Sequence, residues 1–199
     1  GTKYAHHYPK HVEKMVLLSP LGIEKNLKGY SQTFRRADTD AKCTTKYIYA
    51  LARWLLKNHQ SPIDILRFFA GRVTSYLIDD YVTRRLYLDE ESKAKLFPYF
   101  YQISLAKKSG ELAIGRIIEL SLAAYEPTYD EVHEARENGV KIIIGFGQGD
   151  FWNTKFNGHP VSEKLIEDGF DVTIIPEATH QVYFDKPKEC ANIILKLLD

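Results

Sequence analysis

Three short apolar runs constrain the fold of this chain more than any other feature of its sequence. Residues 15–19 (MVLLS), 141–147 (KIIIGFG) and 171–176 (DVTIIP) are almost continuously apolar, without the alternation expected of a strand that has one face in water. Such runs are typical of strands in a parallel sheet that is covered on both faces. The sequence therefore predicts at least three buried parallel strands.

Helices are expected after the second and third runs. Residues 160–168 begin with a proline, which the first turn of a helix accepts, and Gly169 follows where a helix normally stops. Strand, helix, strand, helix in this order predicts an α/β fold with right-handed crossovers. The last helix presents one apolar stripe to the sheet, formed by Cys190, Ile193, Ile194, Leu197 and Leu198.

About 120 residues separate the first run from the second, whereas a crossover needs only about a dozen. We therefore expect three parts: residues 1–22 in the core, 23–139 as a helical insertion, and 140–199 in the core again. Helix starts are predicted inside the insertion at Ser61-Pro62-Ile63-Asp64, at Asp89-Glu90-Glu91 and at Ser109-Gly110-Glu111. Residues 44–58 form an amphipathic basic and aromatic segment, which either packs on the other helices or lies on a membrane surface.

The composition excludes several functions. The 27 Lys and Arg residues nearly cancel the 26 Asp and Glu residues, so a nucleic-acid partner is not expected. Neither a full glycine-rich nucleotide signature nor a histidine–carboxylate set with ligand spacing is present, and we expect no cofactor and no metal. Two cysteines, Cys43 and Cys190, are too few for a disulfide framework, which fits a cytoplasmic or mitochondrial location.

An acid and a histidine follow two successive strands. Asp150 comes after the second apolar run and His180 after the third, and the carboxyl ends of parallel strands share one edge of a sheet. A carboxylate there can fix the tautomer of an imidazole whose other nitrogen takes a proton from a nucleophile. Each residue alone has a plainer explanation, because Asp is common in turns and His is common on surfaces.

Three segments resemble α/β-hydrolases. Residues 4–22 are similar to the stretch that follows the nucleophile of that family, with Ser19-Pro20-Leu21-Gly22 at the end of its strand. Residues 147–152 (GQGDFW) resemble the acid loop, and residues 179–187 (THQVYFDKP) resemble the histidine loop. The likeness is greatest to the lipid-handling members, which include N-acyl-phosphatidylethanolamine lipase, the lipid-droplet lipase co-activator and the cardiolipin-specific deacylase.

This resemblance implies an α/β-hydrolase fold, of which these residues form the C-terminal portion, with the helical insertion as a lid. It implies Asp150 as the catalytic acid and His180 as the general base. The implied substrates are lipid acyl esters, either phospholipids or acylglycerols, and the deacylase likeness favours the mitochondrion. The subfamily's His-x-x-x-x-Asp pattern corresponds to His180 and Asp185, where we expect Asp185 to cap the helix that follows. Thr179 replaces the glycine that commonly precedes the histidine.

The nucleophile of the family is missing from these residues. No serine here, including Ser19, Ser75 and Ser109, has glycine at both flanking second positions. We expect the serine upstream of Gly1, and we expect this chain to fold against the N-terminal half of the hydrolase, covalently attached or as a separate polypeptide. That contact would centre on residues 4–18. The alternative is a catalytically inactive hydrolase-fold subunit with a structural role in a larger assembly.

Overall fold

The computed structural model describes residues 1–23, 50, 54–55, 58, 60–61, 63–69, 71–85, 88–117, 124–153, 155–156 and 159–197. The chain forms two compact units. Gly1–Ser31 and Glu126–Asp199 make the sheet unit, and Gln32–Tyr125 make the helical unit. Each unit is described by itself below.

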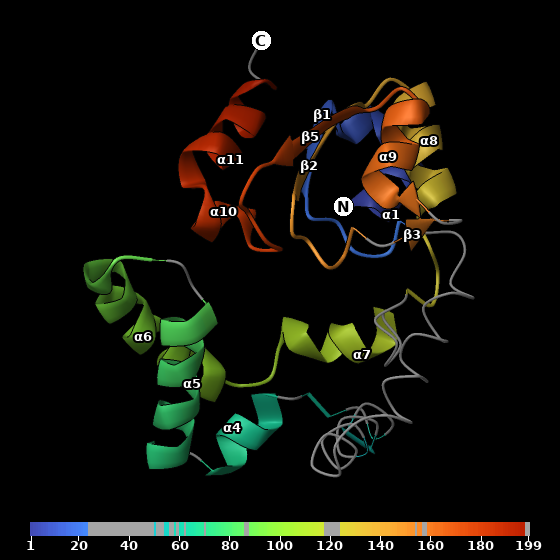
Figure 1. Ribbon diagram of the computed structural model, residues 1–199. Helices are drawn as coiled ribbons and strands as arrows, with labels where there is room; N and C mark the ends of the chain where they lie inside the picture. The colour runs from blue at the N-terminus through green and yellow to red at the C-terminus, as the bar shows by residue number, and fades with distance from the viewer. Residues whose placement is uncertain are drawn as a thin grey trace. The chain divides into compact units, whose positions relative to one another are not determined.

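A three-stranded parallel sheet organises the sheet unit, in the order β1-β2-β5. Strand β1 is Lys14–Leu18, β2 is Lys141–Gly147 and β5 is Asp171–Ile175 (Figure 1). The register places Met15 beside Ile142 and Ile143 beside Asp171. The three predicted strands and their parallel pairing are confirmed. The central strand β2 is buried from its second residue to its last, which explains its unbroken apolar sequence.

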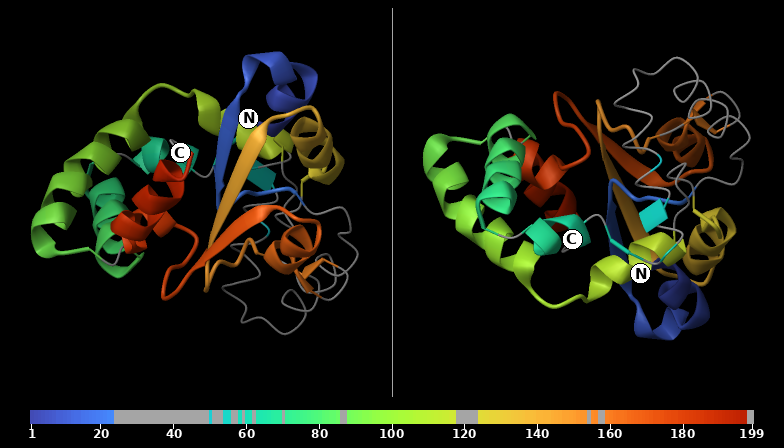
Figure 2. Two further views of the ribbon diagram at one scale, coloured as in Figure 1. Left: turned by 90° about the horizontal axis from the view of Figure 1, so that it is seen from above. Right: turned by 90° about the horizontal axis from the view of Figure 1, so that it is seen from below.

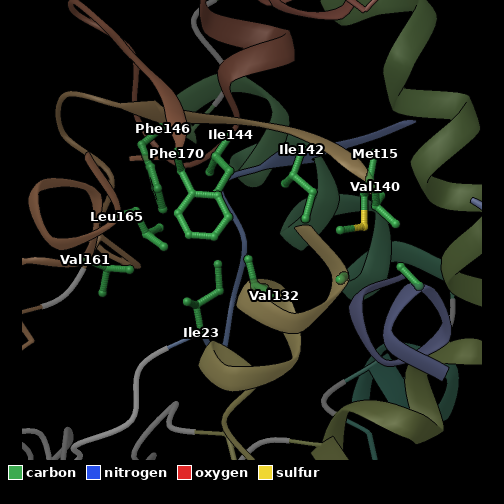
Figure 3. Packing of buried hydrophobic residues seen from close by; sticks show 12 residues of the cluster. Met15, Ile23, Val132, Val140, Ile142, Ile144, Phe146, Val161, Leu165 and Phe170 are labelled. Atoms are coloured by element: carbon green, nitrogen blue, oxygen red, sulfur yellow. The ribbon is translucent and has the colours of Figure 1, made fainter. Parts of the chain in front are cut away.

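Helices cover both faces of this sheet (Figure 2). On one face α1 (Thr2–His7), α8 (Tyr129–Glu137) and α9 (Val161–Glu167) pack against alternate side chains of β2 (Figure 3). On the other face α10 (Val182–Asp185) and α11 (Pro187–Leu195) pack against Ile143 and Ile175. The expected stripe of the last helix is confirmed in part: Cys190, Ile193 and Leu197 are buried, Ile194 is 46% exposed, and Leu198 lies outside the described residues.

Helix α8 falls within the range that we expected for the insertion, residues 23–139, yet it belongs to the sheet unit. Val132 and Ala135 of α8 are fully buried in the same cluster as Ala5 of α1. This burial ties the helix to the sheet core. The unit also holds a 3-10 helix, η1 (Pro9–His11), and a short antiparallel pair, β3 (Lys155–Phe156) with β4 (His159–Pro160).

The described part of the helical unit is built from α4 (Ile63–Phe69), α5 (Gly71–Arg85), α6 (Glu90–Leu105), the 3-10 helix η2 (Gly110–Ala113) and α7 (Ile114–Ile117). The helix start predicted at Ser61 is confirmed. Ser61 Oγ accepts from the Ile63 N–H at 3.1 Å, and the Ser61 N–H donates to Asp64 at 2.8 Å. Asp89 caps α6 by accepting from the Ser92 N–H. Most of residues 44–58 lie outside the described residues, and a lid over the strand ends stays a prediction.

Within the described ranges, no helix combines the length and the apolar character needed to cross a membrane. The same residues contain no group of three or more His, Cys, Asp or Glu side chains arranged to hold a metal ion.

Candidate active site

Two loops leave the sheet at the same edge. Gly147, the last residue of β2, lies beside Ile175, the last residue of β5. Backbone hydrogen bonds then join the loops, because the Gln148 N–H donates to Ile175 O and the Gly149 N–H donates to Ala178 O, each at 2.9 Å. The predicted convergence of the loops that carry Asp150 and His180 is therefore present in the fold.

The closeness of these loops depends on Gly147. A Cβ atom at this position would lie 2.1 Å from the carbonyl oxygen of Thr179 and 2.6 Å from that of Ala178. Real Cβ atoms do not approach other atoms to within 3.0 Å. Only glycine lets the segment before His180 pass this close to the end of β2.

Asp150 and His180 meet at this edge. Nδ1 of His180 lies 3.3 Å from Oδ1 of Asp150, and the Trp152 N–H donates to the same oxygen at 2.9 Å. The Asp150 side chain is fully buried, whereas that of His180 is one-third exposed. Nε2 of His180 has no hydrogen-bond partner among the residues that the structure describes. One ring nitrogen is thus held by a carboxylate while the other is left for a further group.

Aromatic rings flank the imidazole. The ring centres of Phe151 and Trp152 lie 5.1 and 5.7 Å from that of His180. Both aromatic residues follow Asp150 directly in the sequence, so the turn that places the carboxylate also places these rings. They shield part of the imidazole from water and restrict its rotation.

Asp150 is held in its charged form. Burial raises the pKa of its carboxyl group, but the contact with His180, the nearby Ser19 hydroxyl and the hydrogen bond from the Trp152 N–H outweigh burial, and the net effect lowers the pKa. A charged carboxylate at this point favours the tautomer of His180 that carries its proton on Nδ1. That tautomer leaves Nε2 able to accept a proton.

Ser19 is a third residue at this edge; the sequence places it at the end of the first strand but assigns it no role. It follows β1, is 4% exposed and has a positive φ of 45°, a conformation that is uncommon for residues other than glycine. Neither its Oγ nor Asp150 Oδ2 makes a hydrogen bond of standard geometry within the described ranges, yet the hydroxyl lies close enough to lower the pKa of Asp150. Its position directly after β1, the strand next to β2, places it at this edge, but its approach to Asp150 could not be read from the sequence.

Asp185 has a different role from the one expected. Its carboxylate accepts from the N–H and from the hydroxyl of Thr179, both at 2.6 Å. The prediction that it caps the following helix is wrong, because α11 begins at Pro187 and its N-terminus has no side-chain cap. Asp185 instead turns back to fix the loop immediately before His180, and Thr179 supplies a second donor that a glycine would lack.

Comparisons with known proteins find relatives that are named as acyltransferases. A probable 1-acylglycerol-3-phosphate O-acyltransferase of Oryza sativa subsp. japonica is 25% identical over 194 residues, which cover 94% of this chain and 44% of that protein. The 1-acylglycerol-3-phosphate O-acyltransferase ICT1 of Saccharomyces cerevisiae is 22% identical over 211 residues, which cover 98% of this chain and 51% of that protein. The chain thus spans about half the length of the curated relatives it matches. No family model matches it.

A crystal structure of a carboxylesterase from the ammonia-oxidizing Thaumarchaeon Nitrososphaera gargenis is similar to this chain, with a TM-score of 0.50 and 14% sequence identity. The match covers 99% of this chain and 59% of the carboxylesterase. Together with the parallel sheet β1-β2-β5, this likeness confirms the predicted fold class, a partial α/β-hydrolase fold.

Proposed function

We propose that Asp150 and His180 are the acid and the general base of a Ser–Asp–His triad that acts on acyl esters of lipids, either phospholipids or acylglycerols. The observation that carries this proposal is the 3.3 Å contact of His180 Nδ1 with the buried Asp150 carboxylate at the carboxyl ends of adjacent strands. In such a triad the carboxylate orients the imidazole, and Nε2 takes the proton of the attacking serine hydroxyl.

The serine is proposed to come from residues outside these 199. No serine of this sequence has glycine at both flanking second positions, the pattern of the sharp turn that exposes the nucleophile in this fold. Its oxygen would attack the ester carbonyl carbon and release the alcohol, which takes a proton from His180. The resulting acyl-enzyme then passes its acyl group to an acceptor hydroxyl, and His180 removes the acceptor's proton.

The acceptor decides between hydrolysis and acyl transfer. Water as the acceptor releases a fatty acid, as in the lipid-handling lipases and deacylases that the loop motifs resemble. The hydroxyl of a lysophospholipid as the acceptor gives a phospholipid, in keeping with the printed names of the plant and yeast relatives. Both reactions use the same acid and base, so the assignment of Asp150 and His180 holds for either.

The proposed partner is the N-terminal half of the hydrolase, attached to this chain or separate from it. Strand β1 has no neighbour on its outer side among the described residues, and a free strand edge is a site where another strand can add. Tyr4 and Tyr8, within the expected contact region, are each about half exposed. A sharp, cooperative unfolding transition of residues 1–199 as a monomer would contradict this requirement.

The test uses the protein as its gene encodes it, with a phospholipid ester as acyl donor and with either water or a lysophospholipid as acceptor. Asp150→Asn is expected to lower kcat by about 10⁴-fold, as the equivalent change does in a serine protease, and His180→Gln by at least as much. His159→Gln and Asp171→Asn change exposed residues of the same types and are expected to leave kcat unchanged. An inactive natural protein would favour the structural-subunit alternative.

A further inference from the structure

The helical unit contains a cavity of about 900 Å³. It lies among α4, α5, α6 and the segment that follows α6, and its walls include the apolar side chains Ile63, Leu66, Leu77, Ile78, Phe100 and Ile103. The cavity is open to solvent on one side, since Leu77 and Ile103 on its wall are 42% and 44% exposed. Its volume falls near the upper end of the range of ligand pockets, about 300–1,000 Å³.

Arg67, Lys107 and Glu111 lie together on one part of the cavity wall, with Asp64 and Lys108 beside them. Arg67 donates to Asp64 at 3.0 Å, to Glu111 at 2.5 Å and to the carbonyl oxygen of Ala106 at 2.8 Å. Lys108 lies 3.0 Å from the second oxygen of Asp64. Each of these two cations is therefore matched by a carboxylate.

Lys107 is different. It lines the cavity but makes no ion pair within the described part of the chain. The neighbouring charges of Arg67 and Lys108 are balanced by Asp64 and Glu111, so Lys107 leaves this part of the wall with one uncompensated positive charge. An apolar cavity with one available cation suits a ligand that has an alkyl chain and one anionic group.

The charged part of the wall is held in place before any ligand binds. Glu111 accepts from the Ser109 N–H at 2.9 Å, and this bond together with Arg67 lowers the pKa of Glu111 to about 2, so the carboxylate stays charged at neutral pH. Thr74, which is fully buried, donates to the carbonyl oxygen of Leu66 at 2.5 Å and ties α5 to α4. Such preorganisation reduces the entropy lost on binding.

We propose that this cavity binds the alkyl chain of a single-chain anionic lipid, with its carboxylate or phosphate at Lys107. The ligand chemistry is shared by free fatty acids and lysophospholipids. The site is formed entirely by the helical unit, so the proposal does not depend on the roles of Asp150 and His180.

The test measures binding of a fluorescent fatty acid, cis-parinaric acid, to the protein as its gene encodes it. Unlabelled fatty acids of 8 to 18 carbons displace the probe, and each added methylene is expected to strengthen binding about fourfold until the cavity is filled. Fatty alcohols of equal length are expected to bind more weakly than the acids. Affinity that does not change with chain length would overturn the proposal.

Two matched pairs of variants test whether the lipid binds in this cavity. Ile103→Trp fills the cavity, while Tyr99→Trp introduces the same residue one helical turn away, at an exposed position that does not line the cavity. Ile103→Trp is expected to weaken probe binding at least tenfold, and Tyr99→Trp to leave it unchanged. Lys107→Gln is expected to weaken binding of acids up to about fivefold without changing that of alcohols, whereas Lys95→Gln, on the exposed face of α6, changes neither.

The remaining outcomes are equally decisive. Equal probe affinities for the Ile103→Trp and Tyr99→Trp variants would place the lipid elsewhere and overturn the proposal. Displacement by lysophosphatidate but not by fatty acids identifies a phospholipid as the source of the chain, and displacement by fatty acids alone identifies the free acid. A His180→Gln variant that has lost activity but still binds the probe separates this site from the proposed catalytic function.

Discussion

Replacement of Gly147 by alanine tests how tightly the acid loop and the histidine loop are joined. The new Cβ would lie 2.1 Å from the carbonyl oxygen of Thr179, and contacts below 3.0 Å do not occur in real structures. The segment before His180 must therefore retreat by about 1 Å, the shortfall between these two distances. The atom it meets belongs to the backbone, which cannot rotate away as a side chain can.

The free energy of unfolding should fall by about 3 kcal/mol. Overpacking a filled site costs about 1–3 kcal/mol, and a backbone contact belongs at the upper end of that range. Gly145→Ala is the matched control on the same strand, because its Cβ meets only flexible side-chain ends, Ile193 Cδ1 at 2.9 Å and Leu18 Cδ2 at 3.2 Å. We expect that change to cost about 1 kcal/mol. Gly110→Ala has nothing within 4 Å of its Cβ and should stay within about 0.5 kcal/mol of the parent.

Thermal unfolding of the protein as its gene encodes it, followed by circular dichroism, measures this series. For a folding unit of about 150–250 residues each kcal/mol moves Tm by about 2–4 °C, so Gly147→Ala is expected to lower Tm by about 6–12 °C and Gly145→Ala by about 2–4 °C. The order of the three variants matters more than the absolute values. Equal losses of Tm for Gly145→Ala and Gly147→Ala would refute the close approach of the two loops.

Three further changes test other contacts. Asp185→Ala removes the acceptor of both Thr179 donors and is expected to cost about 2 kcal/mol, with faster hydrogen exchange of the Thr179 amide; unchanged exchange would contradict the loop role of Asp185. The pKa of Glu111 is about 2, lowered from 4.5, so its contribution to stability is present above pH 4.5 and is lost as the pH falls toward 2. In urea unfolding between pH 5 and 2, Glu111→Gln should therefore lose less stability than the parent, and parallel curves would argue against its bonds to Ser109 and Arg67. Ser61→Ala removes the cap of α4 and should lower the free energy of unfolding by about 1 kcal/mol in chemical denaturation.

The strands were predictable because their burial is visible in the sequence. A strand covered on both faces admits almost no polar residue, so residues 141–147 could be read without knowing their neighbours. The meeting of Asp150 and His180 was predictable for a related reason, since parallel strands bring their carboxyl ends to one edge. Neither inference requires knowledge of the path that a loop takes between the elements.

What the sequence did not reveal depends on such paths. Asp185 could cap the next helix or turn back to Thr179, and only the backbone between them decides which donors it reaches. Ser19 approaches Asp150 through an uncommon positive φ that no residue pattern announces. The cavity of the helical unit was also not predicted, because periodicity identifies the apolar face of a helix but not the space left between three such faces.

The pairing of β1 with β2 has a consequence during synthesis. Lys14 pairs with Lys141, so more than 120 residues must be translated before the partner of β1 exists. At about 5–20 residues per second this takes roughly 6 to 25 s, during which β1 is on the nascent chain without its partner strand β2. By contrast, β2 and β5 pair Ile143 with Asp171 and can join soon after they emerge. Until residues 141–147 emerge, Lys14–Leu18 lacks the strand that pairs with it in the folded sheet.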